Sequence, residues 1–373
     1  MSLADNPSPS PDGPTAPVPS PQFRPVWSSD LKPADGDVPW LWDGYLAPRN
    51  ITLLISQWKS GKTTLLSALL ARRAAGGTFA GRAIKPGRTA VLCEEDEEHW
   101  RQRRRTLDFG GGVAFFFRPI ACRKPSAAEW RALIESMAGL QASHGVDLAV
   151  IDPLAAFFPG AENQAAPALE ALMPLERLQS LGMAVLILHH PSKGYTLEGQ
   201  SGRGSGAVMG YVDIQIEMRH YTSAADSDRR RVLQTWSRFP TTPKQLVIEW
   251  NADGSDYLTL GGVSDEEFRE HWAGLLPLFE SAPDKLTRRE LRGLLPHGKG
   301  TPSEATLWRW LERAVAGGVL LREGNGHKNA PFRYWLPARE TEWMKDPTYR
   351  LMRQDEEARA QVDRLRLSPP EAG

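Results

Sequence analysis

Short runs of apolar residues recur along the first two thirds of the chain and alternate with stretches of helical periodicity. Four runs, at residues 51–55, 88–93, 146–151 and 183–188, are rich in Val, Ile and Leu, which is typical of strands buried on both faces of a sheet. The stretches between them repeat apolar side chains at helical spacing, most clearly at residues 127–142. Alternating strands and helices predict an α/β fold with a mostly parallel sheet. A further strand is expected at residues 212–218, and two more β-rich stretches at 232–237 and 245–250 close the domain, with antiparallel strands extending the far edge of the sheet.

The first apolar run leads into a segment with a specific chemical pattern. A polar turn follows residues 51–55 and ends in Gly61-Lys62-Thr63, after which leucines recur at helical spacing. A strand, a loop and a helix in this order place backbone N–H groups and a helix N-terminus around a phosphate chain. The predicted phosphate cradle comprises Ser56, Gln57, Trp58, Lys59, Ser60, Gly61, Lys62, Thr63 and Thr64.

Two side chains of this cradle indicate how a nucleotide would bind. Lys62 would reach the β- and γ-phosphates, and the Thr63 hydroxyl would ligate Mg²⁺. A coincidental turn is the alternative. The usual pattern begins with Gly, which tolerates a positive φ, but this chain has Ser56 there. Ser56 is therefore expected either to adopt ordinary dihedral angles or to carry mild strain.

Carboxylates follow two of the other predicted strands. The run at residues 88–93 ends in an acidic cluster that begins with Glu94 and Glu95, and a helix rich in arginine comes next. Such a cluster points into the ligand crevice of an α/β sheet, where one carboxylate could activate water. Capping of the helix is the alternative, and both can hold together. Asp152 ends the run at residues 146–151 and would hold Mg²⁺, with a solvated strand-end carboxylate as its alternative.

The fourth apolar run ends in two histidines. Adjacent residues of a strand face opposite sides, so His189 and His190 are not expected to share a metal ion. One polar side chain here could instead sense the γ-phosphate. The glycine-rich stretch at residues 194–210 carries Arg203 and predicts a mobile loop that leads into a helix.

The N-terminal segment differs in composition from the rest of the chain. Eight of the 30 prolines lie within the first 25 residues, and such a segment buries too little apolar surface to offset its ordering entropy. We therefore expect residues 1–26 to be disordered, with a proline-rich docking ligand as the alternative. The aromatic cluster at residues 38–46 is interpreted as a cap on the core, with stacking on adenine as the alternative.

The last third of the chain predicts a small separate domain. Helical periodicity is found at residues 265–280, 287–295 and 303–317, and a β-hairpin is expected around the turn at residues 324–326. Three helices and a hairpin are typical of a winged helix, whose third helix fits the DNA major groove. Basic residues lie on that helix and the hairpin, namely Arg309, Arg313, Arg322, His327, Lys328 and Arg333. A protein-docking module is the alternative.

The composition of the 373 residues limits partners and sites. Lys and Arg number 45, as do Asp and Glu, so the net charge is +0 and any nucleic-acid surface must be local. Two cysteines, Cys93 and Cys122, permit neither a disulfide framework nor a Cys-based zinc site. No apolar run approaches the length of a membrane span, and the N-terminus lacks a signal-peptide core. A cytoplasmic protein without membrane contact is expected.

These features together resemble the RecA-like P-loop ATPases, and most closely the RepA-type hexameric helicase group among the AAA family ATPases. The resemblance covers about residues 38–260 and rests on six segments in order, which read WLWDGYLAP, SQWKSGKTTL, CEED, VIDPL, LHHPSK and GRGSG. Their order and spacing are specific, whereas each segment alone is not. The resemblance implies a RecA-like core that binds ATP and Mg²⁺ and acts as a ring-forming homo-oligomer, a hexamer in this group.

The resemblance also implies a role for each matching residue. Lys62 and Thr63 would hold the phosphates and Mg²⁺, and Asp152 would be the Walker B carboxylate. Glu95 would be the catalytic base, although Glu94 leaves an ambiguity of one residue.

Three further residues match positions of the family. His190 would sense the γ-phosphate, and Arg203 would be the finger supplied to the ATP of the neighbouring subunit. Arg104 matches a helix arginine that follows the catalytic glutamate.

The chain is thus expected to have four parts: a Pro-rich segment at residues 1–26, a RecA-like ATPase domain at 27–262, a winged helix at 263–340 and a charged tail at 341–373. A DNA-dependent motor in replication or recombination is the first functional hypothesis. The second is a DNA-binding regulator that ATP switches without unwinding. A third is a winged helix that binds a protein of the replication machinery or of a phage.

Overall fold

The structure is a computed structural model that describes residues 25–31, 36–120, 123–160, 164–190, 206–222, 228–296, 301–328, 330–345, 347–349, 351 and 354–355. The chain divides into two compact units, Met1–Pro39 and Trp40–Gly373. In the described part of the first unit, the regular element is the short 3₁₀ helix Ser28–Asp30. The disorder predicted for residues 1–26 falls almost wholly outside the described residues, as does most of the charged tail.

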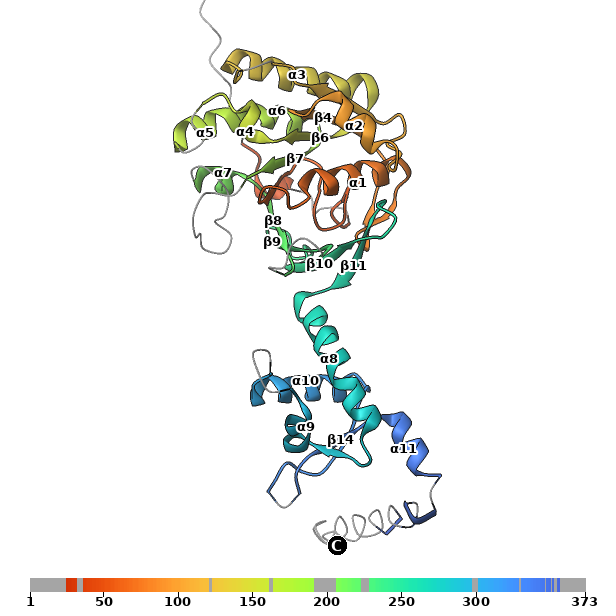
Figure 1. Cartoon of the computed structure of the whole chain (residues 1–373). Helices are drawn as coiled ribbons and strands as arrows, with labels where there is room; N and C mark the ends of the chain where they lie inside the picture. The colour runs from red at the N-terminus through yellow and green to blue at the C-terminus, as the bar shows by residue number, and fades with distance from the viewer. Residues whose placement is uncertain are drawn as a thin grey trace, which may run out of the picture. The chain divides into compact units, whose positions relative to one another are not determined.

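The second unit contains a nine-stranded sheet in the order β11-β10-β9-β8-β1-β7-β6-β4-β5 (Figure 1). The six strands from β8 to β5 run parallel, and β9, β10 and β11 continue the sheet with antiparallel pairing. This confirms the predicted α/β fold with a mostly parallel sheet. The strands are β1 Ile51–Ser56, β4 Arg88–Cys93, β5 Val113–Phe117, β6 Val146–Asp152, β7 Ala184–His189, β8 Ile214–His220, β9 Arg230–Ser237, β10 Gln245–Trp250 and β11 Tyr257–Gly261.

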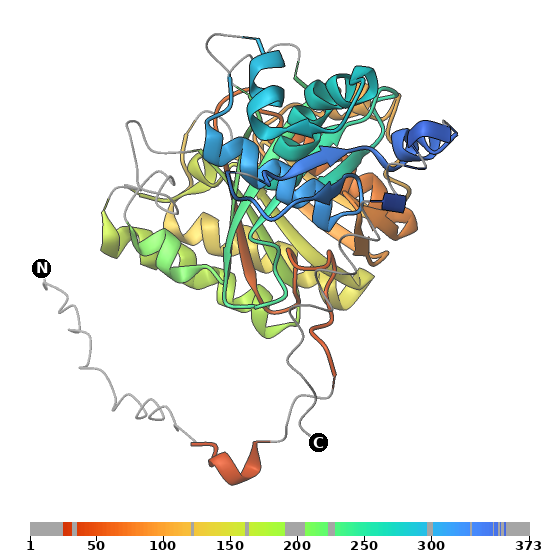
Figure 2. The same cartoon turned by 90° about the horizontal axis from the view of Figure 1, so that it is seen from below.

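Helices cover both faces of this sheet, and Figure 2 shows the same layers from below. Because side chains alternate along a strand, Leu54 of β1 joins the core under α1, whereas Leu53 joins the core under α3, α5 and α6. The helices are α1 Lys62–Ala75, α2 Glu97–Arg103, α3 Ala127–His144, α4 Leu154–Phe157, α5 Ala165–Leu172, α6 Glu176–Ser180 and α7 Gly206–Tyr211. None of the described helices is long and apolar enough to cross a bilayer.

The aromatic segment before β1 is a cap on the core, as expected. Trp42 and Tyr45 are 3% and 0% exposed, and their rings lie 4.4 Å apart. The indole N–H of Trp42 donates to the carbonyl oxygen of Phe79 at 3.2 Å, in the short hairpin of β2 Gly77–Phe79 and β3 Arg82–Ile84. Rings buried this deeply have no free face for adenine, so the stacking alternative is wrong for these two residues.

Several elements differ from the sequence-based expectation, among them the edge strand β11, which was not expected. The edge strand β5 was not expected. Its five residues, VAFFF, are a short apolar run, and the glycines before it were not recognised as the turn that leads into a strand. The single helix expected near residues 168–181 is broken by a 3₁₀ turn at Met173–Leu175, where Pro174 removes a helical N–H donor. Strand β7 begins one residue later than predicted and includes His189, which is 1% exposed.

The C-terminal elements build a core of their own. They comprise α8 Val263–Ser281, β12 Leu286–Thr287, α9 Arg288–Leu294, α10 Glu304–Ala316, β13 Leu321–Glu323, β14 Arg333–Trp335 and α11 Pro337–Trp343. The strands form an antiparallel sheet in the order β12-β14-β13. Apolar side chains of α8, α9, α10 and this sheet pack together, among them Phe279, Leu291, Leu311 and Tyr334. The three helices and the hairpin lie where the periodicity predicted them, whereas the winged-helix class stays a prediction.

Candidate nucleotide site

The loop between β1 and α1 places its unusual backbone angles at Lys59 and Gly61. Their φ angles are 59° and 100°, in the region that favours glycine. Ser56 ends strand β1 and is not among the described residues with a positive φ. Ser56 can therefore replace the usual glycine without strain, because the chain makes its left-handed turns later in the loop.

Ser56 and Ser60 stabilise the loop from behind. They are 3% and 1% exposed, and their hydroxyl groups contact each other. The Ser60 hydroxyl also lies 2.6 Å from the carbonyl oxygen of Gln57, to which it can donate. These two serines therefore shape the cradle without lining it.

The remaining predicted cradle residues line a cleft of about 420 Å³. The cleft also receives side chains from the carboxyl ends of β4, β6 and β7, where an α/β sheet binds its ligands. Its lining residues are Gln57, Trp58, Lys59, Gly61, Lys62, Thr63, Thr64, Glu94, Glu95, Asp152, Pro153 and His190.

The Lys62 ammonium group folds back over the loop. It donates to the carbonyl oxygens of Ser56 at 2.6 Å and Gln57 at 3.4 Å, and it lies 3.2 Å from Nδ1 of His190. Burial lowers the pKa of Lys62 to about 8, although the Asp152 carboxylate opposes this shift. A group held by carbonyl dipoles in a partly dry cleft is available to exchange them for phosphate oxygens.

Asp152 is a buried carboxyl on the opposite wall of the cleft. It is 7% exposed, and burial together with Glu95 raises its pKa to about 7, whereas Lys62 acts in the other direction. Strands β4 and β6 are neighbours with Cys93 opposite Asp152. The Glu94 N–H donates to the carbonyl oxygen of Asp152 at 3.1 Å. The strand pairing therefore fixes the acidic cluster beside Asp152.

The acidic cluster divides into cleft residues and helix-capping residues. Asp96 caps α2 by accepting from the Glu98 N–H at 3.0 Å, and Glu97 pairs with Arg101 at 2.8 Å. Glu94 and Glu95 face the cleft instead. Burial and the neighbouring Glu95 raise the pKa of Glu94. Both interpretations of the cluster thus apply, each to different residues.

Glu95 has a partner that the sequence reasoning missed. Both of its oxygens pair with the Arg103 guanidinium, one of them at 3.0 Å. The guanidinium in turn stacks on Trp100 at 4.8 Å from the ring centroid. Arg104, which the resemblance singled out, contributes to a different hollow beside Phe109. Eight residues separate Glu95 from Arg103, and no sequence signal distinguishes the neighbouring arginines of this helix.

The two histidines at the end of β7 occupy different environments. His189 is buried within the sheet, whereas His190 lines the cleft and lies near the exposed ring of Trp58, at 6.3 Å between centroids. Arg203, the predicted finger residue, lies outside the described residues.

Thr63 and Asp152 fit the chemistry of magnesium. A hydroxyl and a carboxylate on two walls of one cleft are oxygen donors, which Mg²⁺ prefers, and Mg²⁺ in such sites is otherwise held by phosphates and water. A bound cation would also favour the charged form of Asp152.

Residues 17–195 match a family model described as an AAA domain. The matched segment contains the cradle, Glu94, Glu95, Asp152 and His190. A search of curated proteins finds no match to the chain. The family match, the mostly parallel sheet and the strand–loop–helix at β1 support a P-loop ATPase of the AAA or RecA-like kind. Nucleotide binding, usually with Mg²⁺, is the property that a match to the AAA family implies.

Proposed function

We propose that this chain is a Mg²⁺-dependent ATPase whose reaction takes place in the cleft between β1, β4, β6 and β7. The observation that carries the proposal is the convergence of Lys62, Asp152 and the Glu94–Glu95 pair on one cleft beside the cradle. These residues come from segments far apart in the sequence, and each has a defined task in phosphoryl transfer.

The chemical step is an attack of water on the γ-phosphate, in line with the departing ADP. Glu95 would orient the water and accept its proton, and Lys62 would stabilise the charge on the phosphate oxygens. Thr63 and Asp152 would hold Mg²⁺, which neutralises phosphate charge when bound. The Glu95–Arg103 ion pair holds the carboxylate at the cleft wall.

The contact between Lys62 and His190 suggests how the site would report its substrate. Phosphate oxygens would replace the carbonyl and imidazole partners of the ammonium group. His190 would then lie beside the γ-phosphate and lose this contact after hydrolysis. Such a change could be passed to the segment that follows β7.

At the level of biological role, the proposal is a ring-forming, DNA-dependent motor of the RepA-like kind. The six ordered sequence segments support it, and Arg203 would complete the neighbouring subunit's site. The C-terminal helices would contact DNA through Arg309, whose side chain has no ion pair in the described part of the chain. An ATP-switched DNA-binding regulator is the second candidate, because the net charge of +0 gives no global attraction to a nucleic acid that a motor would track.

The experiment that tests this role combines ATPase rates with a native mass. We expect a hexamer whose phosphate release rises severalfold with single-stranded DNA, together with ATP-driven strand displacement. Sequence-specific duplex binding without displacement would favour the regulator. A monomer that is insensitive to DNA would contradict both candidates while leaving the ATPase intact.

The finger assignment has its own variant. Arg203→Ala should bind ATP nearly normally and hydrolyse it about 10³-fold more slowly, as expected for a finger supplied in trans. Near-normal turnover in Arg203→Ala would contradict the assignment.

A further inference from the structure

The phosphate loop is held from behind by an arginine of a distant strand. Nε of Arg231, near the start of β9, donates to the carbonyl oxygen of Ser60 at 2.7 Å. Ser60 is 1% exposed, so this hydrogen bond is largely shielded from water. The contact joins residues 171 positions apart, and no sequence pattern marks it.

The geometry of the peptide bond gives this contact a consequence for the cleft. The carbonyl of Ser60 and the N–H of Gly61 belong to one planar trans peptide and point in opposite directions. Gly61 lines the cleft and Ser60 does not. Within the described chain, the Gly61 N–H has no hydrogen-bond acceptor. A donor that holds the carbonyl from behind therefore turns this N–H toward the place of the phosphates.

The Arg231 guanidinium is itself fixed in place. Its terminal NH1 donates to the carbonyl oxygens of Asp228 at 2.9 Å and Arg230 at 2.8 Å. One rigid fork thus joins the phosphate loop to the backbone at the start of β9. Lysine could not reproduce this arrangement, because it lacks the planar set of donors.

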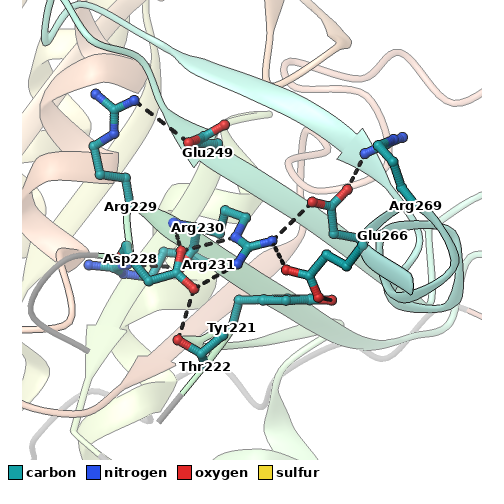
Figure 3. A network of polar contacts seen from close by, with 10 residues as sticks. Tyr221, Thr222, Asp228, Arg229, Arg230, Arg231, Glu249, Glu266 and Arg269 are labelled. Atoms are coloured by element: carbon teal, nitrogen blue, oxygen red, sulfur yellow. Dashed lines mark hydrogen bonds and ion pairs between the residues drawn. The ribbon is translucent and has the colours of Figure 1, made fainter. Parts of the chain in front are cut away.

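The preceding residue of the same strand faces helix α8. Figure 3 shows Arg230 between Asp228 and Glu266 of α8. Arg230 bonds Asp228 at 3.0 and 3.1 Å and Glu266 at 3.0 Å, and it also pairs with Glu270. The Tyr221 ring lies 4.2 Å from the guanidinium carbon.

This network is built more firmly than an ordinary surface pair. Glu266 is 6% exposed and also pairs with Arg269 (Figure 3). The Tyr221 hydroxyl donates to Glu270 at 3.2 Å, and the Thr222 hydroxyl donates to Asp228 at 2.9 Å. Removal of Arg230 would leave carboxylates without their shared cation, so the start of α8 depends on the start of β9.

We propose that Arg231 is a positioning residue that aims the Gly61 N–H at the nucleotide phosphates, and that Arg230 transmits the state of the phosphate loop to α8. The inference rests on the proposed nucleotide site and adds a route out of it. Phosphates that bind the Gly61 N–H polarise the Ser60 peptide and strengthen its bond to Arg231. The start of β9, and through Arg230 the start of α8, becomes more firmly held.

The first test compares Arg231→Met with Arg229→Met by calorimetric titration of MgADP and adenosine. Arg229 is the matched control, since it directly precedes β9 and its guanidinium pairs only at 3.6 Å with Glu249. We expect Arg231→Met to weaken MgADP binding about tenfold or more, the size of one lost charge-assisted hydrogen bond. Arg229→Met should stay within about twofold. Adenosine, which lacks phosphates, should bind both variants equally.

Arg231→Lys keeps the test decisive if Arg231→Met does not fold. It retains one donor for Ser60, so its MgADP affinity should fall severalfold, less than in Arg231→Met. A merely structural role would lower the melting temperature without changing the affinity of the folded protein. Arg231 variants that bind MgADP as tightly as the wild type would overturn the proposal. Failure of the wild type to bind MgADP would instead contradict the proposed nucleotide site.

The second test follows α8 by hydrogen exchange with and without MgADP. In the wild type, MgADP should slow exchange of the amides around Glu266 and Glu270. In Arg230→Met that effect should be lost, while MgADP still binds within about threefold of the wild type. Unchanged exchange at α8 in the wild type, or an equal effect in Arg230→Met, would overturn the transmission.

Discussion

The charged side chains of the nucleotide cleft and those of the C-terminal elements differ in burial and in ion pairing. In the cleft, Glu94 and Asp152 are partly or fully buried carboxyls with raised pKa values and no ion pair among the described residues. On the C-terminal elements, Arg313 of α10 pairs with Asp265 and stacks on Phe268, and Arg322 of β13 pairs with Glu312. Glu95 of the same cleft does have an ion-pair partner, Arg103. Carboxyls with raised pKa values in a cleft, and not the absence of an ion pair alone, therefore mark the groups that are candidates for chemistry.

This difference explains why the two regions support proposals of different depth. The side chains that line the cleft indicate a specific reaction, because their types and positions suit phosphoryl transfer. The six basic residues of the C-terminal helix and hairpin are weaker evidence for DNA binding, since two of them are already paired with carboxylates. Substitutions in the cleft are therefore expected to have larger effects than substitutions on the C-terminal elements.

Lys62→Ala should reduce ATP turnover by about 10²- to 10³-fold and weaken ATP binding, because the cradle loses the ammonium group that would reach the β- and γ-phosphates. Phosphate release and nucleotide titration measure both effects. Lys85→Ala is the control, since Lys85 is exposed and does not line the cleft. Equal activity of the two variants would contradict the role of Lys62.

Glu95→Gln should bind ATP normally and turn over at least about 100-fold more slowly, as for the loss of a general base. Glu94→Gln should retain most of the activity, because its neighbour still faces the cleft. Single-turnover phosphate release separates the two variants. If Glu94→Gln is the inactive one, the base is Glu94 and the register is shifted by one residue.

Arg309→Ala should weaken duplex DNA binding about threefold at low salt, since each lost phosphate contact has a modest cost. Arg313→Ala should change DNA binding less, because Arg313 already contacts Asp265. Fluorescence anisotropy at one fixed salt concentration compares them. A larger effect of Arg313→Ala would mean that its ion pair opens for DNA, and would contradict the expectation that a paired arginine contributes less to DNA binding.

Asp152→Asn should raise the melting temperature of the nucleotide-free protein at pH 8, by about 2–4 °C. The folded protein binds the Asp152 proton more tightly than the unfolded chain, with a pKa near 7 against the ordinary 3.8. Stability is therefore lost as the pH rises from about 4 to about 7, and the neutral amide avoids this loss. Melting curves at pH 4.5 and 8 should differ less in the variant, and equal pH dependence would contradict the raised pKa.

The sequence predicts the fold and the cleft well because both depend on local patterns. Buried strands reveal themselves by apolar runs, and the residues at their carboxyl ends converge once the sheet is parallel. Gly61, Lys62 and Asp152 could be found for this reason. Their roles in catalysis stay predictions until they are measured.

The sequence does not predict contacts between side chains that no periodicity relates. Arg103 and Arg104 are neighbours with identical chemistry, and only the turn of α2 decides that Arg103 meets Glu95. Arg231 reaches Ser60 because β9 follows β8 back along the sheet. Of the two alternatives for Ser56, the one without a positive φ holds, and the left-handed backbone angles lie at Lys59 and Gly61, because the loop as a whole determines where the chain turns.

The measurement that tests the central claim most directly is phosphate release from ATP by the purified wild-type chain, with Mg²⁺ and with a chelator, beside Lys62→Ala. We predict release that requires Mg²⁺ and is nearly abolished in Lys62→Ala. Release that is unchanged by the chelator or by Lys62→Ala, or no ATP binding by the wild type, would contradict the claim that this cleft is an ATPase site.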